Sequence, residues 1–308
     1  MILSAGLTPA WQQILEFDSF QPGEVNRARQ ALWCASGKVF NAALAVHHLG
    51  GPSLALAAVG GPPRAQIEAE FDRLGMPYRW VVTAAATRVC TTILDRRSGA
   101  VTELVENGRP LCDAELDAFC TAYAEEAARA NVAVIIGSLP QGTPSSFYRR
   151  LVERTPGAAV LDFRGEGLMS VLGLEPLVVK PNRQELAQTV GRPLESDDEL
   201  VRAMRSLNDR GARWVVVSQG GKPVWATSAS EVYRFHPPPV RQIVNPIACG
   251  DAMAGTIAWA TRGGLGMVDA VRLGIAAAAE NLADLLPCRL NRAKVRERAE
   301  QVEVDIPG

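Results

Sequence analysis

Short apolar runs alternate with helix-like segments along this chain, and that alternation limits its possible folds more than any other feature. The runs have the length and the Val and Ile content of buried strands, and the segments between them read as helices. Strands are expected at 132–136, 159–163, 177–180 and 214–218, with helices at 145–153 and 199–209. Strands that alternate with helices form a parallel sheet with helices on both faces. The sequence therefore predicts a doubly wound α/β fold, whose ligands bind beyond the carboxyl ends of the strands.

Two segments depart from this alternation. Residues 17–32 and 91–106 look extended, contain turns and carry no helix that could cross between parallel strands. We expect them to form a small antiparallel flap, a β lid made by segments at about 9–34 and 86–108. The chain has no internal repeat, low-complexity tract or linker, which favours a single domain over residues 1–308.

Charge and cysteine content narrow the function classes. The net charge of −1 does not suit a nucleic-acid partner. None of the six cysteines belongs to a C-x-x-C pair, and there are three histidines, which is a poor inventory for structural zinc. The N-terminus lacks the basic and apolar regions of a signal peptide, and no apolar run could cross a bilayer. We expect a cytoplasmic protein with reduced cysteines and no membrane partner.

The stretch 245–255 carries the most specific chemistry. Ala248, Cys249 and Gly250 form a turn of small residues that leads through Asp251 into an apolar helix. Free backbone N–H groups at a helix start bind anions, assisted by the helix dipole. An aspartate among them is either a helix cap or a base that acts beside a phosphate. The segment alone does not decide between these two roles.

The same stretch resembles the C-terminal signature N-x-x-G-A-G-D-x-x-x-G of the PfkB, or ribokinase-like, sugar kinases. The resemblance implies that Asp251 is the catalytic base and that Ala248, Cys249 and Gly250 form the anion hole. A second segment, 180–186, matches the K-P-N-x-x-E-L motif of that family. The similarity extends over nearly the whole chain and is closest to the branch of 1-phosphofructokinase and tagatose-6-phosphate kinase. It implies a ribokinase-like fold with a small β lid.

Matches to the substrate motifs of the family are weaker. Segment 35–42 resembles G-G-K-G-x-N, with Ser36 and Val39 in place of two glycines. A β-branched residue at position 39 would be unfavourable if that position needed a positive φ. An amide, Gln12, replaces the carboxylate that binds sugar hydroxyls in the family. The resemblance implies substrate contacts from Gln12, Gly37, Lys38, Asn41, Arg88 and Ser138, with Lys38 and Arg88 holding a phosphate.

The nucleotide side of the site is predicted from the matching motifs. Asn182 followed by Glu185 has the spacing of a helix cap, which is a sufficient explanation by itself. The resemblance adds a second role, in which these two side chains orient Mg²⁺ through its waters, in keeping with the few protein ligands that this ion takes. It implies ATP contacts from Lys180, Asn182, Glu185, Ser218, Gly220 and Asn281.

Together these features predict an ATP- and Mg²⁺-dependent kinase that phosphorylates a hydroxyl of a sugar phosphate or a related small molecule. The substitutions lie on the substrate side, so we expect a shifted substrate. The alternatives are a sensor of sugar or nucleotide without catalysis on the same fold, and a ribokinase-type kinase of a sugar or nucleoside that carries no phosphate. A homodimer formed through the lid is the expected assembly.

Overall fold

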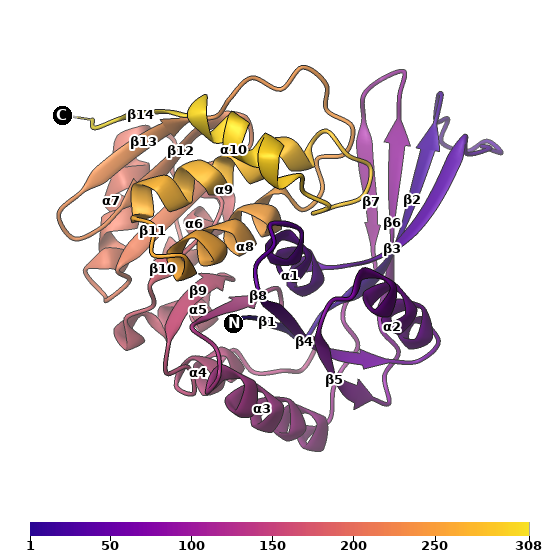
Figure 1. Ribbon diagram of the computed structural model, residues 1–308, viewed down its shortest axis with the longest axis horizontal. Coiled ribbons are helices and arrows are strands. Elements are labelled where there is room, and N and C mark those ends of the chain that lie inside the picture. The colour runs from indigo at the N-terminus through magenta and orange to yellow at the C-terminus, as the bar shows by residue number, and fades with distance from the viewer. Residues whose placement is uncertain (308) are drawn as a thin grey trace.

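A ten-stranded sheet forms the centre of the computed structural model, which describes residues 1–307 (Figure 1). In spatial order its strands are β14 (Glu303–Asp305), β13 (Val232–His236), β12 (Lys222–Thr227), β11 (Trp214–Gln219), β10 (Val178–Val179), β9 (Ala158–Asp162), β8 (Val132–Ile136), β1 (Ile2–Gly6), β4 (Ser53–Gly60) and β5 (Tyr78–Thr83). Pairing is parallel from β11 to β5 and antiparallel from β11 to β14. The predicted, mostly parallel sheet is confirmed.

Side chains that alternate along the strands build one core on each face of the sheet. In β8, Val132, Val134 and Ile136 join the first core, whereas Ala133 and Ile135 join the second. The first face is covered by α1 (Lys38–His48), α2 (Pro63–Leu74), α8 (Cys249–Arg262), α9 (Met267–Asn281) and α10 (Arg292–Glu300). The second face is covered by α3 (Asp113–Ala127), α4 (Phe147–Val152), α5 (Glu166–Met169), η1 (Leu172–Leu174), α6 (Arg183–Val190) and α7 (Asp197–Asn208). Helices lie on both faces, as the sequence predicts.

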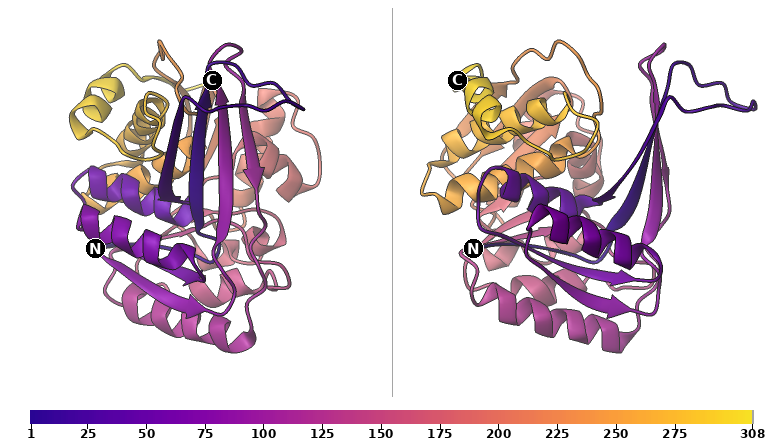
Figure 2. Two further views of the ribbon diagram at one scale, coloured as in Figure 1. Left: turned by 90° about the vertical axis from the view of Figure 1, so that its right-hand side faces the viewer. Right: turned by 45° about the vertical axis from the view of Figure 1, so that its right-hand side comes forward.

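A second, four-stranded sheet extends away from the body (Figure 2). Its strands, in spatial order, are β3 (Gln30–Ser36), β2 (Ala10–Phe17), β6 (Arg88–Asp95) and β7 (Val101–Val105); we call this sheet the lid. Two expectations were wrong. The segment 17–32 is mostly the irregular connection between β2 and β3, since only its first residue and residues 30–32 belong to these strands. The lid is also not wholly antiparallel, since β2 pairs with β6 in parallel.

One glycine fixes the passage from the lid into the body. Gly37, between β3 and α1, has φ 86°, and a Cβ there would lie 2.9 Å from the backbone nitrogen of Ala10. Only glycine combines this backbone conformation with such a close approach. Ser36 and Val39 do not have positive φ, so the substitutions that the sequence raised as a concern cause no strain there.

No helix among residues 1–307 is long and apolar enough to span a membrane.

Candidate active site

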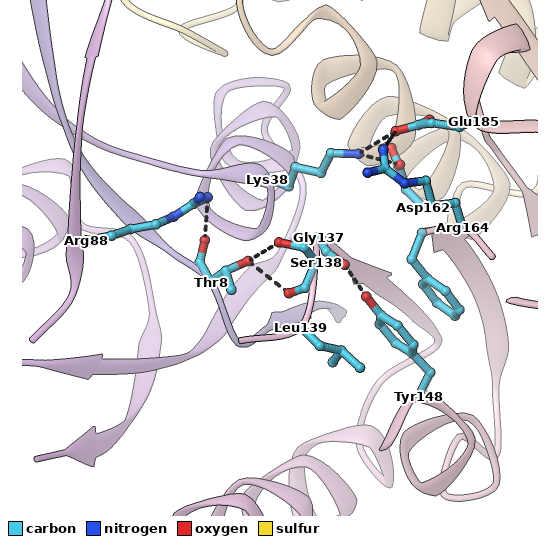
Figure 3. Close-up of a pocket in the computed structure, with 11 residues that line it drawn as sticks. Thr8, Lys38, Arg88, Gly137, Ser138, Leu139, Tyr148, Asp162, Arg164 and Glu185 are labelled. Atoms are coloured by element: carbon cyan, nitrogen blue, oxygen red, sulfur yellow. Dashed lines mark hydrogen bonds and ion pairs between the residues drawn. The ribbon is translucent and has the colours of Figure 1, made fainter. Parts of the chain in front are cut away.

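A cavity of about 420 Å³ lies at the carboxyl ends of the parallel strands, where the body meets the lid (Figure 3). Gly137 follows β8 directly, Asp162 ends β9, and Arg88 begins the lid strand β6. The lining residues are Thr8, Lys38, Arg88, Gly137, Ser138, Leu139, Tyr148, Asp162, Phe163, Arg164 and Glu185. The location agrees with the rule for ligands of parallel sheets.

Asp251 lies in the first turn of α8 and is 6% exposed. Asn41 Nδ2 donates to Asp251 Oδ2 at 2.8 Å, and Asn41 Oδ1 accepts from Ser36 Oγ at 3.1 Å. The sequence prediction made Asn41 a substrate contact, but its side chain is 2% exposed and turned to the carboxylate. In this geometry Asn41 fixes the orientation of Asp251.

The surroundings of Asp251 shift its titration towards neutral pH. Burial and the negative charge of Asp162 raise its pKa, while Lys38, the Asn41 hydrogen bond and Lys180 oppose that rise. The net effect raises the pKa of Asp251 to about 6. A carboxylate with such a value is ionised at neutral pH and is a stronger base than an ordinary aspartate.

The turn before α8 is held by two buried asparagines. Asn245 Oδ1 accepts from the backbone N–H of Ile247 at 3.1 Å. Asn281 Nδ2 donates to the carbonyl of Ile247 at 2.7 Å, and Asn281 Oδ1 accepts from the N–H of Cys288 at 2.6 Å. These contacts occupy the Asn281 amide, which the resemblance had assigned to the nucleotide. Ala248, the residue that caps α8, has a left-handed φ of 67°.

Cys249 begins α8 but is not activated. Burial raises the pKa of its thiol to about 11, so it is protonated at neutral pH. A protonated thiol is a poor nucleophile. The geometry therefore leaves this position to its backbone N–H, at the free end of the helix.

A line of ion pairs leads from the cavity to the start of α8. Asp162, whose side chain is 2% exposed, pairs with Lys38 Nζ at 2.9 Å and with Lys180 Nζ at 3.0 Å. Lys180 Nζ in turn lies 3.4 Å from the place of a Cβ on Gly250. Burial opposes the ionised form of Asp162, but Lys180 and Lys38 outweigh it and lower its pKa. Likewise, burial works against the charge of Lys38, yet Asp162, Asp251 and Glu185 raise its pKa.

Asp162 is a site residue that the sequence prediction did not include. The signal was present, because an acid near the end of the predicted strand 159–163 points to the ligand-binding edge of a parallel sheet. Phe163 and Tyr148 were missed as well. Their rings stack with centroids 3.7 Å apart and planes 1° apart, beside Leu139. Nothing local in the sequence marks that pair, since it depends on how the segments after β8 and β9 pack.

Asn182 and Glu185 form a capping box at the start of α6. Asn182 Oδ1 accepts from the Glu185 N–H at 2.8 Å, and Glu185 Oε2 accepts from the Asn182 N–H at 2.9 Å. Glu185 Oε1 remains on the cavity side, 3.7 Å from Lys38 and 3.6 Å from Arg164. The backbone of Ser218 forms an isolated parallel β-bridge with that of Asn182. Gly220, two residues after Ser218, has φ 63°.

The donors fit a magnesium ion held mostly by water and phosphate. Within residues 1–307 no cluster of three His, Cys, Asp or Glu side chains could hold a metal alone. Glu185 Oε1 is an oxygen donor on the wall of the cavity, whereas both oxygens of Asp162 are paired with lysines. Mg²⁺ takes one or two carboxylates together with waters and substrate phosphates, and Glu185 could supply one of them.

Arg88 and Gln12 differ in their access to the cavity. Arg88 donates to the carbonyls of Pro9 (3.3 Å), Glu106 (3.2 Å) and Thr8 (3.0 Å), and it lines the cavity with Ser138. Gln12 is 3% exposed and donates to Thr92 Oγ1 at 2.8 Å within the lid. Gln12 does not line the cavity, in contrast to the sequence prediction.

Comparison with known proteins places these features in a family. The family described as pfkB family carbohydrate kinase matches residues 6–286. A protein of Thermotoga maritima described as a possible 1-phosphofructokinase is 21% identical with TM-score 0.90, over 100% of both chains. Phosphofructokinase-2 of Escherichia coli in its tetrameric inhibited form is 24% identical with TM-score 0.88, over 97% of this chain and 98% of its own. Arabidopsis thaliana ribokinase is 19% identical with TM-score 0.75, over 97% and 98%.

Proposed function

This chain belongs to the pfkB family of carbohydrate kinases, and on that premise we propose that it transfers the terminal phosphoryl group of ATP to a hydroxyl of a phosphorylated sugar. The transfer of phosphate to a hydroxyl is the activity of the family. ATP as donor and a sugar phosphate as acceptor are the proposed parts.

The observation that carries the proposal is the position and the raised pKa of Asp251. Asp251 would accept the proton of the acceptor hydroxyl while the hydroxyl oxygen bonds to phosphorus and the leaving nucleotide oxygen departs. The N–H groups of Cys249 and Gly250 at the start of α8, together with Lys180, would stabilise the charge on the transferred group. Stabilisation by donors already fixed in place is commonly the largest catalytic contribution.

Arg88 is well prepared for the existing phosphate of the acceptor. Three backbone carbonyls fix its guanidinium, and its remaining N–H groups are free for an anion. A fixed guanidinium loses little entropy when it binds phosphate. Ser138 is exposed at the same wall, and Lys38 connects this end with Asp162.

Glu185 and Asn182 would orient Mg·ATP, with Ser218 and Gly220 beside them. When bound, Mg²⁺ would neutralise charge on the phosphates and hold them in a fixed geometry. The lid would limit access of water to the transfer, which suppresses loss of ATP by hydrolysis. We place the reaction in the cytoplasm and the protein in a homodimer formed through the lid.

The proposal is tested by turnover across free sugars and sugar phosphates, coupled to detection of ADP. We expect turnover of at least one sugar phosphate, and Asp251→Asn should lower kcat by about 100- to 10,000-fold. Calorimetry should show that Mg·ATP still binds to this variant. If wild-type protein does not bind ATP at millimolar concentration, the kinase proposal is wrong.

One observation favours a kinase of sugars without phosphate as the second candidate. The Lys38 ammonium is drawn to Asp162 and Glu185, which leaves Arg88 as the cation at the opposite end of the cavity. Turnover of a free sugar with higher kcat/KM than any sugar phosphate would support that candidate. ATP binding without turnover of any compound would instead support the sensor.

A further inference from the structure

Arg164 is a cation of the cavity that neither the sequence motifs nor the proposed mechanism uses. It follows β9, two residues after Asp162, and its side chain lines the cavity (Figure 3). Its single ion-pair partner among residues 1–307 is Glu185, with Nη1 3.6 Å from Oε1, and the guanidinium makes no hydrogen bond to that part of the chain. Its side chain is 59% exposed.

The other cations of this site have more of their donors engaged within the protein. Lys180 is 3% exposed and paired with Asp162. Lys38 lies between Asp162 and Glu185. Arg88 is bound to three carbonyls. Arg164 is therefore the cavity cation with the most N–H groups free for a ligand, and a guanidinium can bind two phosphate oxygens through parallel hydrogen bonds.

The backbone on both sides of Arg164 is held in place, although the guanidinium group of Arg164 makes no hydrogen bond to the residues that the structure describes. On one side Phe163 is 5% exposed and stacks on Tyr148, whose hydroxyl donates to the Gly137 carbonyl. On the other side the N–H of Gly165 donates to Thr189 Oγ1 at 3.0 Å. A fixed backbone with an unbound guanidinium group suits a residue that binds a ligand in one defined position.

We propose that Arg164 binds phosphate oxygens in the cavity and thereby contributes to phosphoryl transfer or to acceptor recognition. Glu185 holds it at the edge of the transfer site in the absence of ligands, and phosphate oxygens replace that weak contact when substrates bind. The phosphate has two sources, the terminal group of the nucleotide and the phosphate of the acceptor. The inference rests on the proposed function for its substrates, but the affinity for phosphate is a property of Arg164 itself.

The test compares Arg164→Gln with Arg213→Gln as a matched control. Arg213 is 60% exposed and lies 3.5 Å from Glu175, but it does not line the cavity. Calorimetry with inorganic phosphate, Mg·ADP, the non-hydrolysable Mg·AMPPNP and fructose 6-phosphate requires no turnover. Loss of a charge-assisted contact should weaken the affected ligand by about 10- to 100-fold.

The pattern identifies the source of the phosphate. Weaker Mg·AMPPNP binding with unchanged Mg·ADP binding points to the terminal phosphate of the nucleotide, and a lower kcat should accompany it. Weaker binding of inorganic phosphate and fructose 6-phosphate with unchanged nucleotide binding points to the acceptor. Arg164→Lys should recover part of either loss, because it restores the charge but not the two parallel bonds.

Two results would overturn the inference. The first is an Arg164→Gln variant that binds every ligand within about threefold of the Arg213→Gln control. The second is an Arg164→Gln variant that differs from wild type only in the Mg²⁺ concentration required for activity. That result would mean that Arg164 merely positions Glu185. Either result leaves the kinase proposal intact, since wild-type turnover and Asp251→Asn test that proposal separately.

Discussion

The protonation of Asp251 is set by contacts that single substitutions can remove. Asn41 donates to its carboxylate, which stabilises the ionised form and lowers the pKa that burial has raised. In wild-type protein kcat/KM should therefore fall as pH drops through about 6, because the base becomes protonated. In Asn41→Ala this acid limb should move to higher pH, which profiles of kcat/KM against pH will measure.

Ser36→Ala is the control for that prediction. It removes the donor to Asn41 but leaves the bond from Asn41 to Asp251 in place. Its acid limb should stay close to that of wild type. An Asn41→Ala profile whose limb lies at or below the wild-type pH would contradict the role of Asn41 as the residue that positions the base.

Ala248 is the second position where one atom matters. It caps α8 with φ 67°, a conformation that costs a residue with a Cβ about 1–2 kcal/mol. Glycine removes that cost, but it raises the conformational entropy of the unfolded chain, which destabilises the folded protein by about 0.4–1 kcal/mol. We expect Ala248→Gly to raise the free energy of unfolding by up to about 1.6 kcal/mol, as measured by urea denaturation.

Ala254→Gly in the same helix is the control, and it should lower the free energy of unfolding. Ala254 has helical φ and is fully buried, so glycine there should destabilise the protein by about 1 kcal/mol or more. If Ala248→Gly is destabilising to a similar degree, the left-handed cap does not strain the wild-type protein.

At the scale of elements, periodicity and strand ends predicted most of the fold that positions the site. The expected strand 132–136 coincides with β8, and the predicted helix 199–209 corresponds to α7. The helix start at Asp251 and the capping box of Asn182 and Glu185 were also predicted correctly, because both are encoded locally.

The rest depends on contacts between distant segments. Asn41 and Asp251 are 210 residues apart, so no local pattern shows that one binds the other. The pairing of Asp162 with Lys180 arises because β9 and β10 are neighbours in the sheet. The motif predicts that Gln12 contacts the substrate. Side chains alternate between the two faces of β2, however, and this alternation places Gln12 on the same face of the lid as Thr92.

The start of α6 combines a structural and a proposed functional role that one substitution can separate. Serine caps helices about as well as asparagine, so Asn182→Ser should keep the free energy of unfolding within about 0.5 kcal/mol of wild type. It removes the amide that we place near Mg·ATP, and the Mg²⁺ concentration for half-maximal activity should rise about tenfold.

Asn182→Ala is the comparison, since it removes the cap as well and should lose about 1 kcal/mol of stability. Denaturation and Mg²⁺ titration of both variants measure the two effects independently. An Asn182→Ser variant with an unchanged Mg²⁺ requirement would show that Asn182 is only a helix cap.

At the scale of the whole molecule, the two faces of the lid differ in what covers them. On the face towards the body, Ile14, Cys34 and Leu94 form a cluster against which Leu285 and Leu286 pack. The opposite face carries a cross-strand row of Trp33, Gln13, Thr91 and Leu104, with Trp11 stacked on Trp33 at 6.0 Å. Trp33 is 46% and Leu104 55% exposed. Exposed apolar surface of this kind marks interaction sites.

We expect the wild-type protein to dimerise through that row, and Trp33→Glu to shift it to monomer. A charge in the centre of an apolar interface loses its water without gaining a partner. Sedimentation velocity at micromolar concentration measures the change. Leu265→Glu, at a residue 43% exposed between α8 and α9, should remain dimeric. A monomeric wild-type protein, or a Trp33→Glu variant that remains dimeric, would exclude this face as the interface. In either case Trp33, the central aromatic residue of the row, would not contact a second subunit.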